Sequence, residues 1–177
     1  YTLGFVPELQ QTLMEDDCYL PFRKRALTTL TAGAELVSDM ENAEALRSGV
    51  DRAVGEAKNA AWGKKGCFAE YRLAAPAETS AVRLVFDSDL NRETLPEWEY
   101  QLNRPMRHNI RLCHVKSHMP QTVVRDFDVT FTLADGSTVT EQIRGNHQRL
   151  VRIPCAKTIR AVRVTLLETW GVAECHL

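Results

Sequence analysis

Apolar and polar residues alternate along several short stretches of this chain, with a period of two that is typical of β-strands buried on one face. The alternation is clearest in residues 82–87, 127–133 and 162–166. Asp135 and Gly136 separate the second of these stretches from another at residues 137–143, and Asp-Gly in that place is a strong signal for a two-residue hairpin. Shorter strands are expected at three further places: residues 67–73, 150–154 and 172–177. Seven or eight short strands without a long helix between them predict an all-β fold, an antiparallel β-sandwich.

The first part of the chain has a different pattern. Leu9 and Leu13 lie one helical turn apart, and residues 7–17 are expected to form a short N-terminal helix that ends before Pro21. Beyond this point the strand pattern takes over. We therefore divide the chain into a helical leader or linker, residues 1–25, and a β-sandwich, residues 26–177. The leader is expected to dock on the sandwich or on a partner.

Composition narrows the classes of function. Of the 177 residues 44% are hydrophobic and 25% are charged, and the net charge is -1, as in an ordinary globular protein. Nucleic-acid binders are usually basic, and a membrane span needs about 18 consecutive apolar residues, which this chain lacks. We therefore expect neither a nucleic acid nor a membrane as partner. Because the chain begins with Tyr1 rather than Met, we expect it to be a fragment or a processed product.

Cysteine usage favours a reducing environment. The five Cys residues include no Cys-x-x-Cys pair, and a chain of this size does not need disulfides to fold. Free Cys is among the most buried residue types, so these thiols are expected in or near the core. The expected location is the cytoplasm.

Motifs for catalysis are scarce. The sequence contains no nucleophile elbow, no His-Glu-x-x-His, no P-loop and no dinucleotide fingerprint, which favours a non-catalytic protein. One alternative is a small metalloprotein or enzyme, because imidazoles and a thiolate are zinc ligands. Its candidate ligands lie within eleven residues of one another: His108, Cys113, His114 and His118.

The three Trp residues receive different interpretations. Trp62 and Trp170 are expected in the core, because a large apolar ring is more often covered than exposed. For Trp98 the sequence does not decide between a buried position in the core and an exposed position on the surface. Together with Tyr100 and Arg107 it is the best candidate for an exposed aromatic surface that stacks on a sugar, flanked by polar groups.

Four stretches of the sequence, taken together, resemble those of a known domain in their order along the chain. They are residues 48–52 (SGVDR) followed by Trp62, residues 82–87 (VRLVFD), residues 146–149 (NHQR) and residues 159–171 (IRAVRVTLLETWG). In this order and spacing they resemble a discoidin domain, the coagulation-factor type C module, over about residues 27–177. The resemblance implies a galactose-binding-like jelly roll.

This resemblance also implies where ligands would bind. Recognition would use loops at one end of the sandwich, in residues 39–65, 91–121 and 145–149. Asn146 and Arg149 are the expected ligand contacts in the last of these loops. The ligand class expected from the resemblance is carbohydrate.

The resemblance further implies a structural calcium ion beside the Gly-containing turn. Calcium takes six to eight oxygen ligands, and the corresponding side chains here are Asp51 and Glu174. The alternative is an ion pair between Glu174 and an Arg such as Arg52.

A narrower resemblance concerns the parent protein. Residues 9–21, 86–92 and 146–150 resemble the C-terminal region of a bacterial family of FAD-dependent oxidoreductases. This implies that a catalytic domain upstream in the same chain binds FAD and is the partner of the sandwich, while the fragment itself holds no flavin. The predicted function is therefore a non-catalytic accessory module of a larger enzyme, serving docking or carbohydrate binding. The alternative is a stand-alone carbohydrate-binding module.

Overall fold

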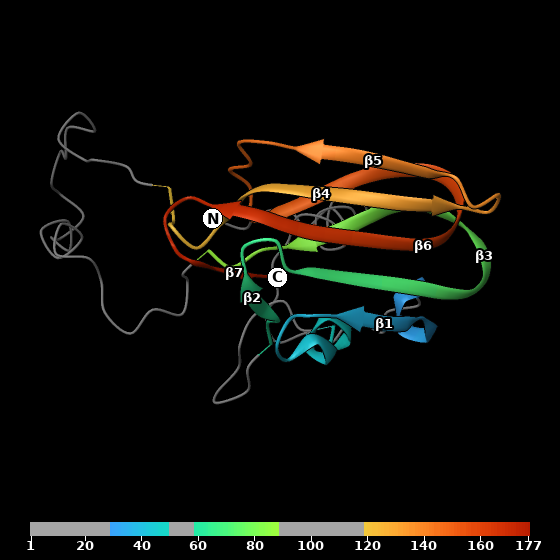
Figure 1. Ribbon diagram of the computed structural model, residues 1–177, viewed down its shortest axis with the longest axis horizontal. Coiled ribbons are helices and arrows are strands. Elements are labelled where there is room, and N and C mark those ends of the chain that lie inside the picture. Colours follow the sequence, from blue (N-terminus) through green and yellow to red (C-terminus); the bar gives the residue numbers. More distant parts are fainter. Residues whose placement is uncertain (1–28, 50–58, 89–118) are drawn as a thin grey trace, which may run out of the picture.

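Antiparallel strands form almost all of the regular structure. The computed structural model describes residues 29–49, 59–88 and 119–177 (Figure 1). The expected helix at residues 7–17 lies outside these ranges. The described elements are η2 (Leu30–Gly33), β1 (Glu35–Ser38), η3 (Ala43–Arg47), β2 (Trp62–Lys64), β3 (Phe68–Val85), β4 (Val124–Leu133), β5 (Thr138–Ile143), β6 (Leu150–Thr169) and β7 (Glu174–His176). The fold class predicted from the alternation, an antiparallel β-sandwich, is confirmed.

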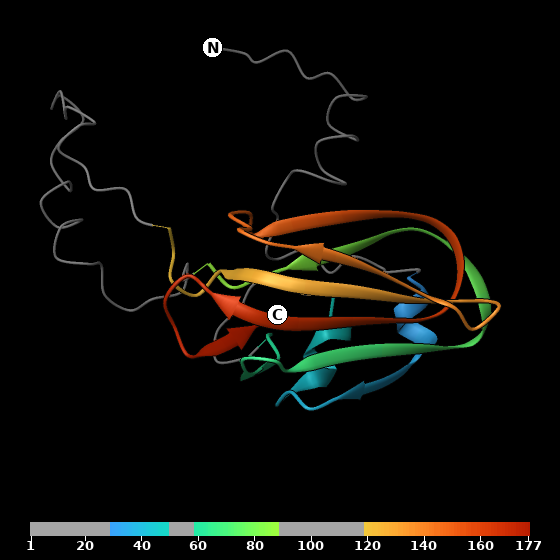
Figure 2. The ribbon, with the colours of Figure 1, turned by 45° about the horizontal axis from the view of Figure 1, so that its top comes forward.

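Two sheets contain these strands. The larger has the order β1-β3-β6-β4-β5, and the smaller pairs β2 with β7; all of these pairs are antiparallel. In Figures 1 and 2 the long strands β3 and β6 run side by side and turn back together at one end of the molecule. One half of each strand lies in each layer, so the larger sheet folds over into a sandwich.

The long strands differ from the sequence expectation. The sequence predicts separate strands at residues 67–73 and 82–87, but both fall largely within the single strand β3. It likewise predicts separate strands at residues 150–154 and 162–166, and both lie within β6. The ladder between the two strands skips from Arg72 to Ala77, and Pro76 lies in this gap. Pro has no backbone N–H to donate to a β-ladder, so pairing is interrupted at Pro76. The strand bends at this interruption.

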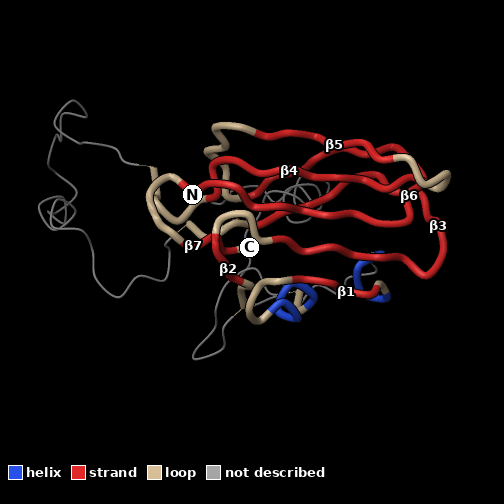
Figure 3. The backbone as a smooth tube through the Cα atoms, in the orientation of Figure 1, coloured by secondary structure: helices blue, strands red, loops and turns tan. Residues whose placement is uncertain are grey.

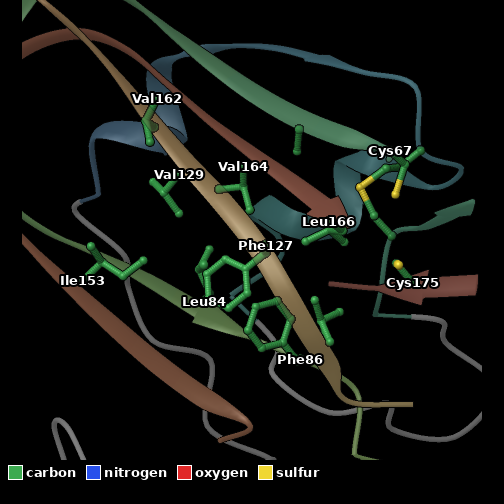
Figure 4. Packing of buried hydrophobic residues seen from close by; sticks show 14 of the residues in the cluster. Cys67, Leu84, Phe86, Phe127, Val129, Ile153, Val162, Val164, Leu166 and Cys175 are labelled. Atoms are coloured by element: carbon green, nitrogen blue, oxygen red, sulfur yellow. The ribbon is translucent and has the colours of Figure 1, made fainter. Parts of the chain in front are cut away.

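The core lies between the two layers, and the period-two pattern accounts for it. In β4 the side chains of Phe127, Val129 and Phe131 are buried, while alternate residues face outward. Phe86, which follows β3 in the opposite layer, packs on Phe127 with ring centroids 4.9 Å apart and an interplanar angle of 57° (Figure 4). Burial of each such ring contributes about 1.5–3 kcal/mol.

The connections divide between the two ends of the sandwich. One end holds the bends of β3 and β6 and the β4–β5 hairpin, where Gly136 has φ 88° and the Asp135 carboxylate accepts the Ser137 amide at 2.9 Å. A hairpin is therefore confirmed at the predicted place, but four residues rather than two separate β4 from β5. The other connections gather at the opposite end, which we call the loop end (Figure 3). Its described residues are 39–42, 64–67, 86–88, 119–123, 144–149 and 170–173.

The prediction that the cysteines are buried free thiols is confirmed for the three that the structure describes. Cys67, Cys155 and Cys175 are buried free thiols, and the other two Cys residues lie outside the described ranges. Within those ranges no helix is long and apolar enough to cross a membrane.

Candidate functional site

An exposed tryptophan marks the loop end. Trp170 follows the last residue of β6 and retains 40% of its surface accessible to solvent. The expectation that it lies in the core is therefore wrong. Its strand ends at Thr169, and the turn towards β7 carries the next side chain outside the sandwich. Trp62 is only partly buried, in β2.

Hydrogen bonds hold Trp170 in place in spite of its exposure. Its indole Nε1–H donates to the carbonyl oxygen of Asn146 at 2.7 Å, and its backbone N–H donates to the carbonyl of Val123 at 3.2 Å. The next residue, Gly171, donates to the carbonyl of Gln121 at 3.0 Å. A Cβ at Gly171 would lie 2.9 Å from Cδ of Gln121, so glycine permits this close approach. The ring is therefore exposed and fixed at the same time.

Asn146 shapes the turn that receives the indole. Its side chain is buried, and its Nδ2 donates to the carbonyl oxygens of Val124 at 2.8 Å and Gln148 at 3.0 Å. Its Oδ1 accepts the backbone N–H of Gln148 at 3.0 Å. The preceding Gly145 has φ 68°, a conformation that suits glycine. The amide of Asn146 is thus occupied with the backbone of its own turn and of β4.

An ion pair lies beside the indole. The Arg125 guanidinium carbon is 5.9 Å from the centre of the Trp170 ring, within the range of a cation–π contact. Its Nε and Nη2 donate to Oδ2 of Asp126 at 3.0 and 2.9 Å. The other carboxylate oxygen of Asp126 accepts the Gly145 amide at 2.9 Å. Asp126 therefore joins the cation beside the ring to the turn beneath it.

The electrostatics of Asp126 follow from these contacts. The hydrogen bonds from Arg125 and then from the Gly145 amide lower the pKa of the carboxyl below its ordinary value. The same pair raises the pKa of Arg125. Both groups are charged at neutral pH, and their charges cancel beside the ring.

The arrangement offers a flat apolar surface with a polar border. The side chains of Gln121, His147 and Gln148 are exposed in the segments that hold Trp170. Amides and an imidazole can donate or accept hydrogen bonds, whereas the indole N–H is already engaged. The site can thus pair apolar contact on the ring with hydrogen bonds at its edge.

The predicted ligand contacts are only partly described. Trp98, Tyr100 and Arg107 lie outside the described residues, as do His108, Cys113, His114 and His118. Arg149 lies at the loop end, where its Nε donates to the carbonyl of Phe86 at 3.2 Å. Asn146 is held as described above. Ligand binding by these residues stays a prediction.

The predicted calcium ligands are likewise only partly described. Asp51 and Arg52 lie outside the described residues. Glu174, in β7, has an exposed carboxylate 3.7 Å from Nε2 of His176, whose Nδ1 is 3.5 Å from the carboxylate of Asp87. Among the described residues no group of three or more His, Cys, Asp or Glu side chains could hold a metal ion. The calcium site stays a prediction.

Sequence reasoning missed Trp170, Arg125 and Asp126 as site residues. The available signal for Trp170 was Gly171, which marks a turn directly after the long apolar alternation. Arg125 and Asp126 are adjacent in the sequence, and an Arg-Asp pair alone does not indicate a site. Their part in the site depends on Gly145, which only the fold brings close.

Comparison with known proteins bears on the fold. No protein-family profile matches the chain, and no curated protein matches it either. Solved structures do match. The family 32 carbohydrate-binding module of Streptococcus pneumoniae EndoD superposes with a TM-score of 0.56 and 15% identity, over 83% of this chain and 91% of the module. The fold is that of the galactose-binding-like β-sandwich.

Two further structures have the same fold at similar distance. A fucose binding module of Streptococcus pneumoniae, SpX-3, matches with a TM-score of 0.54 and 12% identity, over 85% of this chain and 93% of that one. The lectin domain of lectinolysin, complexed with Lewis B antigen, matches with the same TM-score and identity, over 85% of this chain and 92% of the domain. The jelly-roll architecture implied by the discoidin resemblance is therefore confirmed.

Proposed function

We propose that this chain is a non-catalytic carbohydrate-binding module that uses Trp170 as its stacking surface. The observation that carries the proposal is an exposed indole whose orientation is held by hydrogen bonds at its Nε1 and its backbone. Among the described residues the exposed large hydrophobic side chains are Leu30 and Trp170, and the indole of Trp170 adds a flat aromatic face held in one orientation, which suits a binding surface. A ring that is already ordered loses little conformational entropy when a ligand binds.

The chemistry of the surface suits a neutral sugar. One face of a pyranose carries C–H groups that can lie on an aromatic ring, while its hydroxyl groups need hydrogen-bond partners at the border. Gln121, His147 and Gln148 are exposed and can supply them. The charge of Arg125 is balanced by Asp126, so the cation beside the ring does not by itself select for an acidic sugar.

The matched structures support the same ligand class. They are a family 32 carbohydrate-binding module, a fucose binding module and a lectin domain complexed with Lewis B antigen. At 12–15% identity these likenesses concern the fold, and the ligand class is inferred for this chain together with the Trp170 surface.

The place of the module in a larger protein rests on the sequence. The resemblance of residues 9–21, 86–92 and 146–150 to an FAD-dependent oxidoreductase family supports a role as an accessory domain, which docks on a catalytic domain or presents it to a carbohydrate. The alternative, a stand-alone carbohydrate-binding module, would use the same Trp170 surface.

Isothermal titration with galactose, N-acetylgalactosamine, glucose and fucose tests the proposal. We expect at least one sugar to bind and Trp170→Ala to weaken its binding by about 2 kcal/mol, roughly 30-fold, as for a central Trp in an interface. The matched control is Leu30→Ala, because Leu30 in η2 is 43% exposed and precedes β1 at the opposite end of the sandwich. No heat from any sugar at millimolar concentration, or equal losses in the two variants, would contradict the proposal.

A further inference from the structure

Two buried thiols lie in contact at the loop end. Cys67 immediately precedes β3, and Cys175 is the middle residue of β7, close to the end of the chain. They are 5% and 0% exposed. Figure 4 shows their two sulfur atoms turned towards one another, and the two thiols shift each other's pKa. Residues distant in sequence thus bring two reactive groups together away from water.

Both cysteines are neighbours of the same glycine, Gly63. Gly63 in β2 is the direct partner of Cys175 in the β2–β7 ladder. A Cβ at Gly63 would lie 2.8 Å from Cβ of Cys67 and 3.0 Å from its Sγ. Cys67 therefore packs directly on the strand that carries the partner of Cys175. The two thiols thus flank Gly63 from β7 and from the start of β3, and a disulfide between them needs Cα atoms about 5.5–6 Å apart.

Both cysteines are also held by the backbone. The turn from β2 into β3 has Gly66 at φ 92°, and the Cys67 N–H donates to the carbonyl of Lys64 at 2.9 Å. The carbonyl of Cys67 accepts the N–H of Leu166 in β6 at 2.9 Å. Cys67 is thus fixed to the large sheet, whereas Cys175 belongs to a strand of only three residues.

We propose that Cys67 and Cys175 form a reversible disulfide that ties the C-terminal strand β7 to the start of β3. The oxidant is a low-molecular-weight disulfide. A thiolate of one cysteine attacks a sulfur of that disulfide, which gives a mixed disulfide and releases one small thiol. The second cysteine then loses its proton and attacks the protein sulfur of the mixed disulfide. The protein S–S bond forms, the second small thiol leaves, and the two electrons and two protons of the cysteines pass to the two small thiols.

The surroundings indicate which thiol reacts first. The hydrogen bond from Cys67 lowers the pKa of Cys175, with a further contribution from the charge of Lys65. The same hydrogen bond, together with burial, raises the pKa of Cys67. Cys175 is therefore the attacking thiol, since the thiolate is the nucleophile. Because it is fully buried, the reaction needs β7 to separate transiently from β2.

The cross-link acts on the segment that carries the proposed binding surface. Residues 170–173 connect β6 to β7, so oxidation fixes the β7 end of the segment that contains Trp170, while its other end already lies in β6. It also closes a long loop in the unfolded chain, which lowers the entropy of the unfolded state and stabilises the fold. We thus expect an oxidised form that unfolds at a higher temperature than the reduced form.

Peptide mapping of the wild-type chain tests the cross-link without any variant. The 177-residue chain is incubated with oxidised glutathione, and remaining thiols are blocked before digestion. The expected product is a peptide that joins Cys67 to Cys175, and dithiothreitol restores both thiols. Free thiols at both positions after oxidation, or pairing of either one with another Cys, would overturn the proposal.

Thermal unfolding of three single variants supplies the second measurement. Oxidation should raise the Tm of the wild type and of Cys155→Ser, since Cys155 is a buried thiol outside the pair. It should leave the Tm of Cys67→Ser and Cys175→Ser unchanged. A rise that persists in either of these two variants, or that is absent from Cys155→Ser, would contradict the assignment.

Discussion

Replacement of Asn146 by Ala tests how the turn beneath the indole is built. Asn146 makes three side-chain hydrogen bonds, to the carbonyls of Val124 and Gln148 and from the Gln148 N–H. The variant keeps the backbone carbonyl that accepts the Trp170 indole. It removes only the side chain that holds this carbonyl in position, so any effect on Trp170 is transmitted through the turn.

The magnitude follows from the number of bonds lost. Each net hydrogen bond contributes about 1 kcal/mol, so the free energy of unfolding should fall by about 3 kcal/mol. For a chain of this size, that corresponds to a fall in Tm of about 6–12 °C. The effect is a large share of the about 5–15 kcal/mol that stabilises a typical domain.

Urea denaturation measures the loss of stability, and acrylamide quenching of Trp fluorescence reports on the indole. The matched control is Gln148→Ala in the same turn, because the side chain of Gln148 is exposed and only its backbone takes part in the hydrogen bonds above. It should change the free energy of unfolding by less than about 0.5 kcal/mol. An Asn146→Ala variant as stable as this control, with unchanged quenching, would refute the reasoning.

Two further predictions concern the core and the response to acid. Phe127→Ala should lower the free energy of unfolding by about 3–5 kcal/mol in urea denaturation, because it leaves a cavity against Phe86; a change below about 1 kcal/mol would show that the two layers do not pack there. Because the pKa of Asp126 is lowered in the fold, its ion pair stabilises the protein fully above the unfolded pKa near 4 and is lost as the pH falls through the folded pKa. The loss of stability between about pH 5 and pH 2 should therefore be smaller in Asp126→Asn than in the wild type, and equal acid sensitivity would contradict the assignment.

The strands were predictable because their signal is local. Phe127, Val129 and Phe131 face one side of β4 simply because successive side chains of a strand point to opposite faces. The continuity of β3 across Pro76 was not predictable in this way. It depends on β6, which bends together with β3 and pairs with it on both sides of Pro76. The hydrophobic pattern of one segment does not show which other strand will pair with it.

The candidate site was less accessible to sequence reasoning for a related reason. The burial of Trp170 depends on whether another element covers it, and hydrophobicity alone favoured the core. Asn146 was singled out through the discoidin resemblance, yet its hydrogen bonds to the carbonyl of Val124 in β4 follow from the packing of the β5–β6 turn against β4. The contact of Asp126 with Gly145 likewise joins residues that only the folded chain brings together.

The most direct test of the proposed binding surface is an NMR titration that follows the indole N–H signals. The chain contains Trp62, Trp98 and Trp170, and Trp-to-Phe variants assign each signal. On addition of the sugar that gives heat in calorimetry, we predict that the Trp170 signal shifts with a saturation curve while that of Trp62 stays in place. A saturating shift confined to Trp98, with Trp170 unmoved, would contradict the account and place the sugar on the surface predicted around Trp98, Tyr100 and Arg107.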